Sequence, residues 1–167
     1  ITSVRIGAIT ISSSAWSTSS GVLTLKPAYS SLLQSTGTKT VVVVATGFTN
    51  DTIYQSISAG AATKLAFGTQ PTAPSYNGGA LATQPVVLLQ DQYGNTSTSG
   101  ATVTAAVASG SGSWTLGGTV SIGGSAGVAT YTNLTATCTT GLAGAKITFT
   151  STGLTSLTSN SFNIPNP

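Results

Sequence analysis

Thr40–Thr46 reads Thr-Val-Val-Val-Val-Ala-Thr, and this β-branched run decides the fold class. Val and Thr branch at Cβ, which favours extended backbone over helix. A short apolar run bounded by turn residues is typical of a buried strand. Further along the chain, Ala101–Val107 and Lys146–Ser151 alternate between apolar and polar residues with the period of two that strands follow. Together these stretches predict an all-β protein.

Glycines separate such runs along the whole chain, for example Gly37, Gly47 and the pairs at 78–79, 117–118 and 123–124. Many short strands with turn residues between them indicate a β-sandwich or a barrel. Only Tyr29–Gln34 has the composition for a helical turn. We expect strands near residues 3–11, 21–26, 39–46, 52–58, 63–69, 85–91, 101–108, 113–116, 119–122, 126–132, 145–151 and 157–164.

A run of small residues, Ser58–Thr63, marks the predicted boundary between two domains. Residues 63–167 have the length and strand number of a complete immunoglobulin-like sandwich. Residues 1–62 hold only four or five predicted strands, which is thin for a core of their own. We therefore expect two immunoglobulin-like β-sandwich domains, of which the first is short and is completed by a strand from a neighbouring subunit.

The second part resembles a bacterial immunoglobulin-like repeat of the invasin and intimin type (Big-like), found in large extracellular surface proteins. The most recognisable block is a strand followed by an Asp-x-x-Gly-Asn turn. The blocks are Lys64–Pro71, Gln84–Asn95, Gly127–Leu134 and Ser159–Ile164. The resemblance covers residues 63–164 and implies a sandwich fold at the cell surface, whereas the first part is only weakly similar, through Gly37–Phe48.

The residue types that carry catalysis are nearly absent. The chain has no His, one Cys and two carboxylates, Asp51 and Asp91. General acid–base catalysis and metal binding both draw on clusters of these types. The sequence therefore predicts neither an enzyme nor a metal or cofactor site. Both aspartates lie in turn-like sequence, and Asp91, Gly94 and Asn95 form a predicted structural turn motif.

Charge is scarce: 4% of residues are charged, against roughly 25% in ordinary domains. Thr and Ser fill 55 of the 167 positions. The five cations are scattered, so no basic stripe predicts nucleic-acid binding. Two interpretations of such a surface stay open. It is either the Ser/Thr-rich surface of a halotolerant or secreted protein, or a surface buried against copies of the same chain.

Further sequence features concern processing and modification. The chain begins at Ile1 without a signal-peptide pattern, from which we expect a processed, secreted protein. Its longest apolar run, Val41–Ala45, is too short for membrane insertion. Cys138 is expected to be either a small buried residue or half of an intermolecular disulfide. Sequons for N-glycosylation begin at Asn50, Asn95 and Asn133.

These features predict a structural subunit of an extracellular assembly, such as a pilus-like filament, a sheath or an S-layer. The partners would be other copies of the chain, joined by β-sandwich contacts or by donor-strand complementation. The predicted donor strand is the N-terminal segment, with its apolar residues Ile1, Val4, Ile6, Ile9 and Ile11, and the C-terminal segment Phe162–Pro165 is a second candidate. The alternative is a stalk or adhesion module of a larger surface adhesin, with glycans or a host surface as partners.

Overall fold

The computed structural model describes all 167 residues of the chain as an all-β protein. Its helical elements are three 3-10 turns of three residues each, Ser13–Ala15 (η1), Pro27–Tyr29 (η2) and Ser31–Leu33 (η3). The last two overlap the stretch that the sequence assigned to a helical turn. The predicted all-β class is therefore confirmed. A separate finding is that no helix reaches the length and apolar character of a membrane span.

Contacts within the chain gather in two compact units, Ile1–Ala59 and Gly60–Pro167, called unit 1 and unit 2 below. Each has a buried hydrophobic cluster of its own. The boundary predicted from the sequence, between residues 62 and 63, lies a few residues further along the same small-residue stretch. Independent folding of residues 1–62 and 63–167 stays a prediction.

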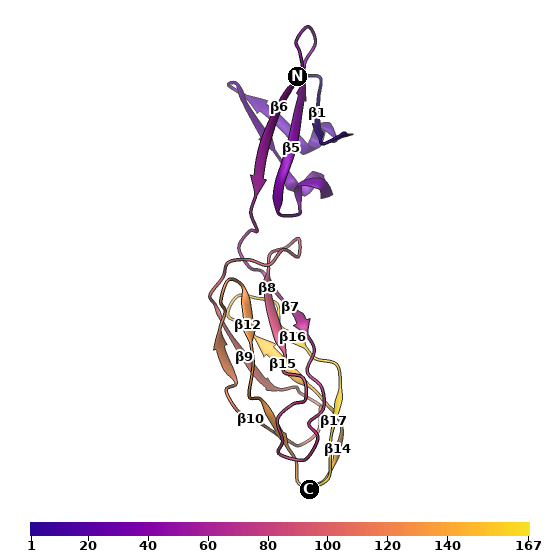
Figure 1. Cartoon of the computed structure of the whole chain (residues 1–167), viewed down its shortest axis with the longest axis vertical. Helices are drawn as coiled ribbons and strands as arrows, with labels where there is room; N and C mark the ends of the chain where they lie inside the picture. Colours follow the sequence, from indigo (N-terminus) through magenta and orange to yellow (C-terminus); the bar gives the residue numbers. More distant parts are fainter. The chain divides into compact units, whose positions relative to one another are not determined.

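Unit 1 is built around a four-stranded antiparallel sheet with the order β2-β1-β5-β6, in which β5 lies between β1 and β6 (Figure 1). A separate hairpin, β3–β4, packs beside it. The strands are β1 (Ser3–Ile6), β2 (Ile9–Thr10), β3 (Trp16–Ser19), β4 (Val22–Leu25), β5 (Gly37–Val44) and β6 (Asp51–Ile57). The Val-rich run that decides the fold class thus forms most of the central strand.

The core of unit 1 is small. Val41 of β5 and Val4 of β1 are fully buried, and Ile6, Ile11 and Leu33 pack with them. Few apolar side chains are therefore removed from water in this unit. A chain of about 60 residues buries only about 60% of its unfolded surface, which makes unit 1 marginal as an isolated fold.

The N-terminal segment differs from its prediction as one strand over residues 3–11. It forms two strands, because Gly7 has a φ of +60° and opens a tight hairpin that pairs Ile6 with Ile9. A two-residue hairpin loop with Gly at its first position needs this positive φ. Strand β3 was not predicted, because Trp-Ser-Thr-Ser shows no alternation. It is held by pairing with β4 across a Ser20-Gly21 turn.

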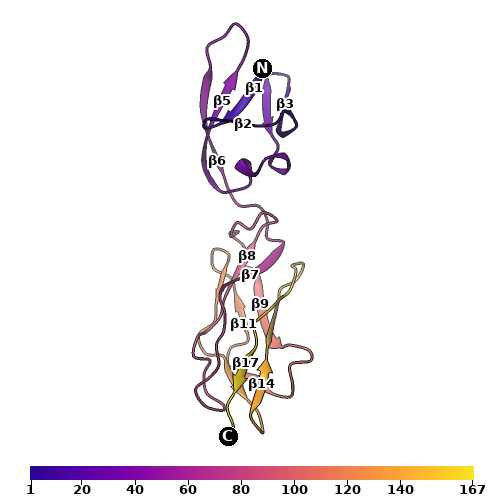
Figure 2. The ribbon, with the colours of Figure 1, turned by 90° about the vertical axis from the view of Figure 1, so that its right-hand side faces the viewer.

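Unit 2 holds two main sheets, β12-β8-β7 and β11-β9-β15-β16, together with the pairs β10–β13 and β14–β17. The last pair lies beside the C-terminus (Figure 2). The strands are β7 (Lys64–Thr69), β8 (Val86–Gln90), β9 (Thr102–Val107), β10 (Thr115–Gly117), β11 (Ser121–Gly123), β12 (Val128–Thr130), β13 (Thr135–Thr137), β14 (Leu142–Ala145), β15 (Ile147–Thr150), β16 (Leu157–Thr158) and β17 (Phe162–Ile164). Of these, β13 and β14 were missed from the sequence.

Aromatic side chains join the two main sheets of unit 2. Phe149 of β15 makes edge-to-face contacts with Phe67 of β7 and with Tyr131, which follows β12, at ring-centroid distances of 5.5 Å. The Tyr131 hydroxyl donates to the Val103 carbonyl oxygen of β9 at 2.8 Å. Burial raises the pKa of Tyr131 to about 12, which keeps this donor protonated. The facing sheets and their shared core have the form of a β-sandwich.

Candidate interaction surface on unit 1

Strand β6 is the most exposed of the longer strands of the protein. It lies at the edge of its sheet and pairs with β5 alone. Its first six residues are exposed on both faces, and only Ile57 is partly covered. An edge strand of this kind offers a row of backbone N–H and C=O groups to another chain. Strand β6 is therefore the centre of the candidate interaction surface.

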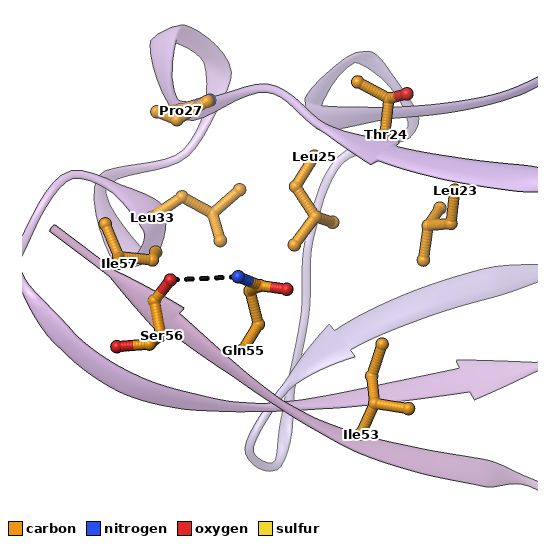
Figure 3. Close-up of a pocket in the computed structure, with 9 residues that line it drawn as sticks. All are labelled: Leu23, Thr24, Leu25, Pro27, Leu33, Ile53, Gln55, Ser56 and Ile57. Carbon is orange, nitrogen blue, oxygen red and sulfur yellow. Dashed lines mark hydrogen bonds between the residues drawn. The ribbon is translucent and has the colours of Figure 1, made fainter.

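A groove lies between β6 and the hairpin strand β4 (Figure 3). Its volume is about 420 Å³, within the range of roughly 300–1,000 Å³ that ligand pockets have. The lining side chains are mostly apolar, and Gln55 is held at its edge by a hydrogen bond to the Ser56 carbonyl oxygen. The lining residues are Leu23, Thr24, Leu25, Pro27, Leu33, Ile53, Gln55, Ser56 and Ile57.

Exposed large apolar side chains gather on unit 1, which carries seven of the nine in the chain. Tyr54 of β6 is 75% exposed, and Phe48, in the loop that leads into β6, is 79% exposed. The others are Ile1, Ile9, Val22, Tyr29 and Ile53. Of the seven, Phe48, Ile53 and Tyr54 belong to β6 and the loop before it, where they add apolar surface beside the groove.

Charge is almost missing from this surface. Asp51, the first residue of β6, is the only charged residue on the strand. The neighbouring strand β5 carries Lys39, whose ammonium group donates to the Ser35 hydroxyl at 2.8 Å. Recognition at β6 would therefore depend on backbone pairing and apolar contact rather than on ion pairs.

The predicted turn motif belongs to unit 2. Asp91 is 3% exposed, and its carboxylate accepts hydrogen bonds from the backbone N–H groups of Gly60, Tyr93 and Asn95 at 2.9 to 3.0 Å. Gly94 has a φ of +90°, the left-handed conformation that glycine tolerates. Asp91 thus ties the first residue of unit 2 to the turn that follows β8.

The hydrogen bonds of Asp91 also set its charge. Burial by itself raises the pKa of this carboxyl group, but the bonds from the Asn95 side chain and from the backbone of Gly60, Asn95 and Tyr93 outweigh it. The pKa of Asp91 is lowered to about 2, so the group is ionised and fully occupied by donors from its own unit. Asp51 differs from its expected place in a turn, because it begins β6 opposite Val43.

The three sequon asparagines differ in their surroundings. Asn50 is exposed in the loop before β6. The amide nitrogen of Asn95 donates to both carboxylate oxygens of Asp91, and that of Asn133 donates to the Thr119 hydroxyl at 3.0 Å. A glycan on either amide would compete with these bonds. Glycosylation stays a prediction for all three, and Asn50 has the environment that suits it best.

The predicted donor strand lies inside its own unit. Val4, Ile6 and Ile11 are buried in the core of unit 1, whereas Ile1 and Ile9 are exposed. Donation of this segment to a neighbour would require the buried residues to leave that core. Within the single chain, β1 already occupies the place in the sheet that the same strand from a neighbouring copy would take. Strand donation stays a prediction.

Cys138 lies in the core of unit 2 and is 7% exposed. Its backbone N–H donates to the Asn77 side-chain oxygen, and the Asn77 amide donates to the Cys138 carbonyl oxygen at 2.7 Å. This burial favours the first of the two expectations, a small core residue, over an intermolecular disulfide.

The groove on unit 1 could not be predicted from the sequence, because its lining comes from β4, η2, η3 and β6, and β6 is far from the others in the chain. The one available signal was Thr52–Ile57, where two isoleucines and a tyrosine stand in a stretch predicted as a strand. Whether an edge of that strand is left unpaired depends on the order of the strands in the sheet. The residue pattern of a single strand does not reveal that order.

Comparisons with known proteins bear on unit 1 above all. Residues 1–58 match the family model described as heme-binding protein Shr-like, Hb-interacting domain. The match fits a cell-surface protein. No curated protein matches the chain. The crystal structure of a β-glycosidase from Bacteroides vulgatus aligns over 98% of this chain at 14% identity and a TM-score of 0.47, and the chain spans 21% of that structure.

Proposed function

We propose that this chain is an interaction module of an extracellular surface protein, in which unit 1 recognises a folded protein and unit 2 is a spacer. The observation that carries the proposal is the exposure of Phe48, Ile53 and Tyr54 on β6 and the loop before it, beside an apolar groove. A surface with little charge and several exposed aromatic rings suits protein recognition, because aromatic anchors dominate the energetics of such contacts.

The matching family supplies a candidate ligand, since its description names hemoglobin interaction over the residues of unit 1. Direct coordination of the heme iron would need a side chain that can ligate iron. Haem iron is held by His, Cys, Met or Tyr. The chain has no His or Met, and its one Cys lies in unit 2, so the only side chains of these types in unit 1 are Tyr29 and Tyr54. Because His, Cys and Met are all missing from unit 1, the proposal is contact with the globin protein, and the titration with free hemin tests ligation by tyrosine.

Unit 2 supports the spacer role through its strand grouping. Strands β7, β8 and β12 share one sheet, and β9, β15 and β16 share the other. This grouping corresponds to the A, B, E and the C, F, G strands of an immunoglobulin sandwich. It agrees with the resemblance to bacterial immunoglobulin-like repeats over residues 63–164, which we retain as part of the proposal.

A binding titration tests the ligand. Purified hemoglobin, and separately free hemin, would be added to the chain and to the double variant Phe48→Ser with Tyr54→Ser. We expect saturable hemoglobin binding that the double variant weakens by about thirtyfold or more, because the loss of even one central aromatic contact costs about 2 kcal/mol. Tyr76→Ser is the matched control, since Tyr76 is 66% exposed on unit 2. Absent binding, or an equal loss in the control, would refute hemoglobin recognition by this surface.

Self-assembly is the second candidate, favoured by the open edge of β6 and the scarcity of charge. A pilus-like filament, a sheath or an S-layer would then form from copies of the chain. Negative-stain electron microscopy of the concentrated protein separates the two candidates. Regular filaments or sheets would support the structural subunit, whereas dispersed particles that bind hemoglobin would support the recognition module.

A further inference from the structure

Strand β6 has one satisfied edge and one open edge. All seven of its residues, Asp51–Ile57, pair in continuous register with β5. No backbone hydrogen bond reaches β6 from any other part of the chain. The Ser56 carbonyl oxygen accepts a hydrogen bond from the Gln55 side chain. The other backbone groups that point away from β5 face solvent, and the partner that satisfies them in series is another extended strand.

The usual protections of an edge strand are missing from β6. It contains no Lys, Arg or Pro, and its register with β5 has no bulge. It is also longer than the typical strand of about five or six residues. Proteins that keep an edge unpaired use such devices to prevent association. Their absence here indicates an edge that is paired when the protein functions.

We propose that β6 pairs antiparallel with β6 of a second copy, about a twofold axis that passes beside Tyr54. In this register Tyr54 lies opposite Tyr54 of the second copy, Thr52 opposite Ser56, and Ile53 opposite Gln55. The pairing joins the two four-stranded sheets into one continuous eight-stranded sheet. It satisfies the open edges of both copies with the same set of bonds.

The side chains suit this register on both faces of the sheet. On one face, a tyrosine pair lies on the axis and is flanked by Thr–Ser pairs, combinations that stabilise strand pairing. On the other face, Gln55 of the second copy covers part of Ile53, which is 43% exposed in the single chain. Asp51 lies opposite Ile57, so the two carboxylates are about 20 Å apart along the strands. The register places no like charges opposite each other.

This contact makes a dimer and not a filament. A twofold contact uses the same patch on both copies, and it closes as soon as two copies have met. The inference thus goes beyond recognition of a ligand, and it narrows the self-assembly candidate, because a filament would need a second and different contact. Its test contains no hemoglobin, so its failure leaves the ligand proposal standing, and the reverse also holds.

Disulfide trapping tests the register. Residues directly opposite in an antiparallel pair have Cα atoms about 4.5–5.5 Å apart, within the reach of a disulfide. In a Cys138→Ala background, Tyr54→Cys is expected to form a covalent dimer under mild oxidation. Phe48→Cys is the matched control, because residue 48 is equally exposed but lies outside the strand. Equal or faster trapping at residue 48 would overturn the proposal.

A pair of variants makes the register test sharper. Thr52→Cys and Ser56→Cys, mixed, are expected to form a mixed disulfide, because residues 52 and 56 lie opposite each other. Neither variant alone is expected to form a disulfide between two of its own copies, because the same residue of the two copies is about 13 Å apart along the strands in this register. Efficient trapping of either variant with itself would contradict this register.

Light scattering on the unmodified chain checks the contact without cysteines. We expect the mass to rise from one copy towards two with concentration, and to stay at one copy in Ser56→Lys. Thr18→Lys, an exposed change on β3, is expected to dimerise normally, and circular dichroism would confirm that both variants are folded. A chain that stays monomeric at every concentration, or that forms assemblies larger than a dimer through β6, would contradict the proposed twofold dimer.

Discussion

At the scale of single residues, Asp91 has the largest structural role of the few charged groups. Its carboxylate accepts bonds from the backbone of Gly60, Tyr93 and Asn95, so it fixes both the entry of the chain into unit 2 and the turn after β8. Removing the carboxylate leaves these donors without their partner. Hydrogen bonds to charged groups contribute about 1.5–3 kcal/mol to stability. A variant at this position therefore affects unit 2 as a whole.

The change Asp91→Ala is predicted to lower the free energy of unfolding of unit 2 by about 1.5–3 kcal/mol at neutral pH, measured by urea denaturation. The lowered pKa adds a pH signature. The folded-state pKa of about 2 lies below the ordinary value of 3.8, so the stabilisation is present above pH 4 and is lost as the pH falls towards 2. The wild type and the variant should converge there, and a constant difference down to pH 2 would refute this role.

The change Tyr131→Phe is predicted to destabilise unit 2 by about 1–2 kcal/mol, because the Val103 carbonyl oxygen loses its buried donor. The ring and its contact with Phe149 are retained, so the packing is nearly unchanged. Thermal unfolding measures the effect. Tyr76→Phe, on an exposed tyrosine, is the control and is expected to change nothing.

At the scale of elements, the N-terminal strand determines whether unit 1 has a core. β1 pairs with the last four residues of β5, and its side chains Val4 and Ile6 are buried there. Deleting residues 1–11 is predicted to unfold unit 1 and to leave unit 2 folded. Amide NMR spectra of the deleted chain would show this, through collapsed signals from residues 12–59 alone. A unit 1 that stays folded without the segment would mean that β1 is dispensable for its core.

Individual elements also show what the sequence can predict. The Val-rich run, the alternating run at residues 101–108 and the strand before Asp91 were each placed correctly as β5, β9 and β8, because burial imposes a clear pattern on them. Strands β3, β13 and β14 were missed, since their small or polar residues form strands only through pairing with β4, β10 and β17. The groove depends on strand order, a property of several segments together.

At the scale of the whole molecule, the two units differ in what they bury. Unit 2 has a core of 17 buried residues, and unit 1 has six. Residues 60–167 expressed alone are therefore predicted to unfold in one cooperative transition, whereas residues 1–59 alone are predicted to be marginal and to gain stability with concentration or ligand. Calorimetry of the two fragments measures both, and a stable unit 1 that is indifferent to concentration would argue against a functional contact at β6.

If the chain functions through the surface of unit 1 around β6, occupation of that surface will slow amide exchange there. Hydrogen exchange would be measured along the whole chain, with the protein dilute, concentrated, and mixed with hemoglobin. We expect slowed exchange in the concentrated or mixed sample to be confined to Phe48–Ile57 and the groove residues of β4. Unchanged exchange in unit 1 under every condition, or protection located in unit 2 instead, would contradict it.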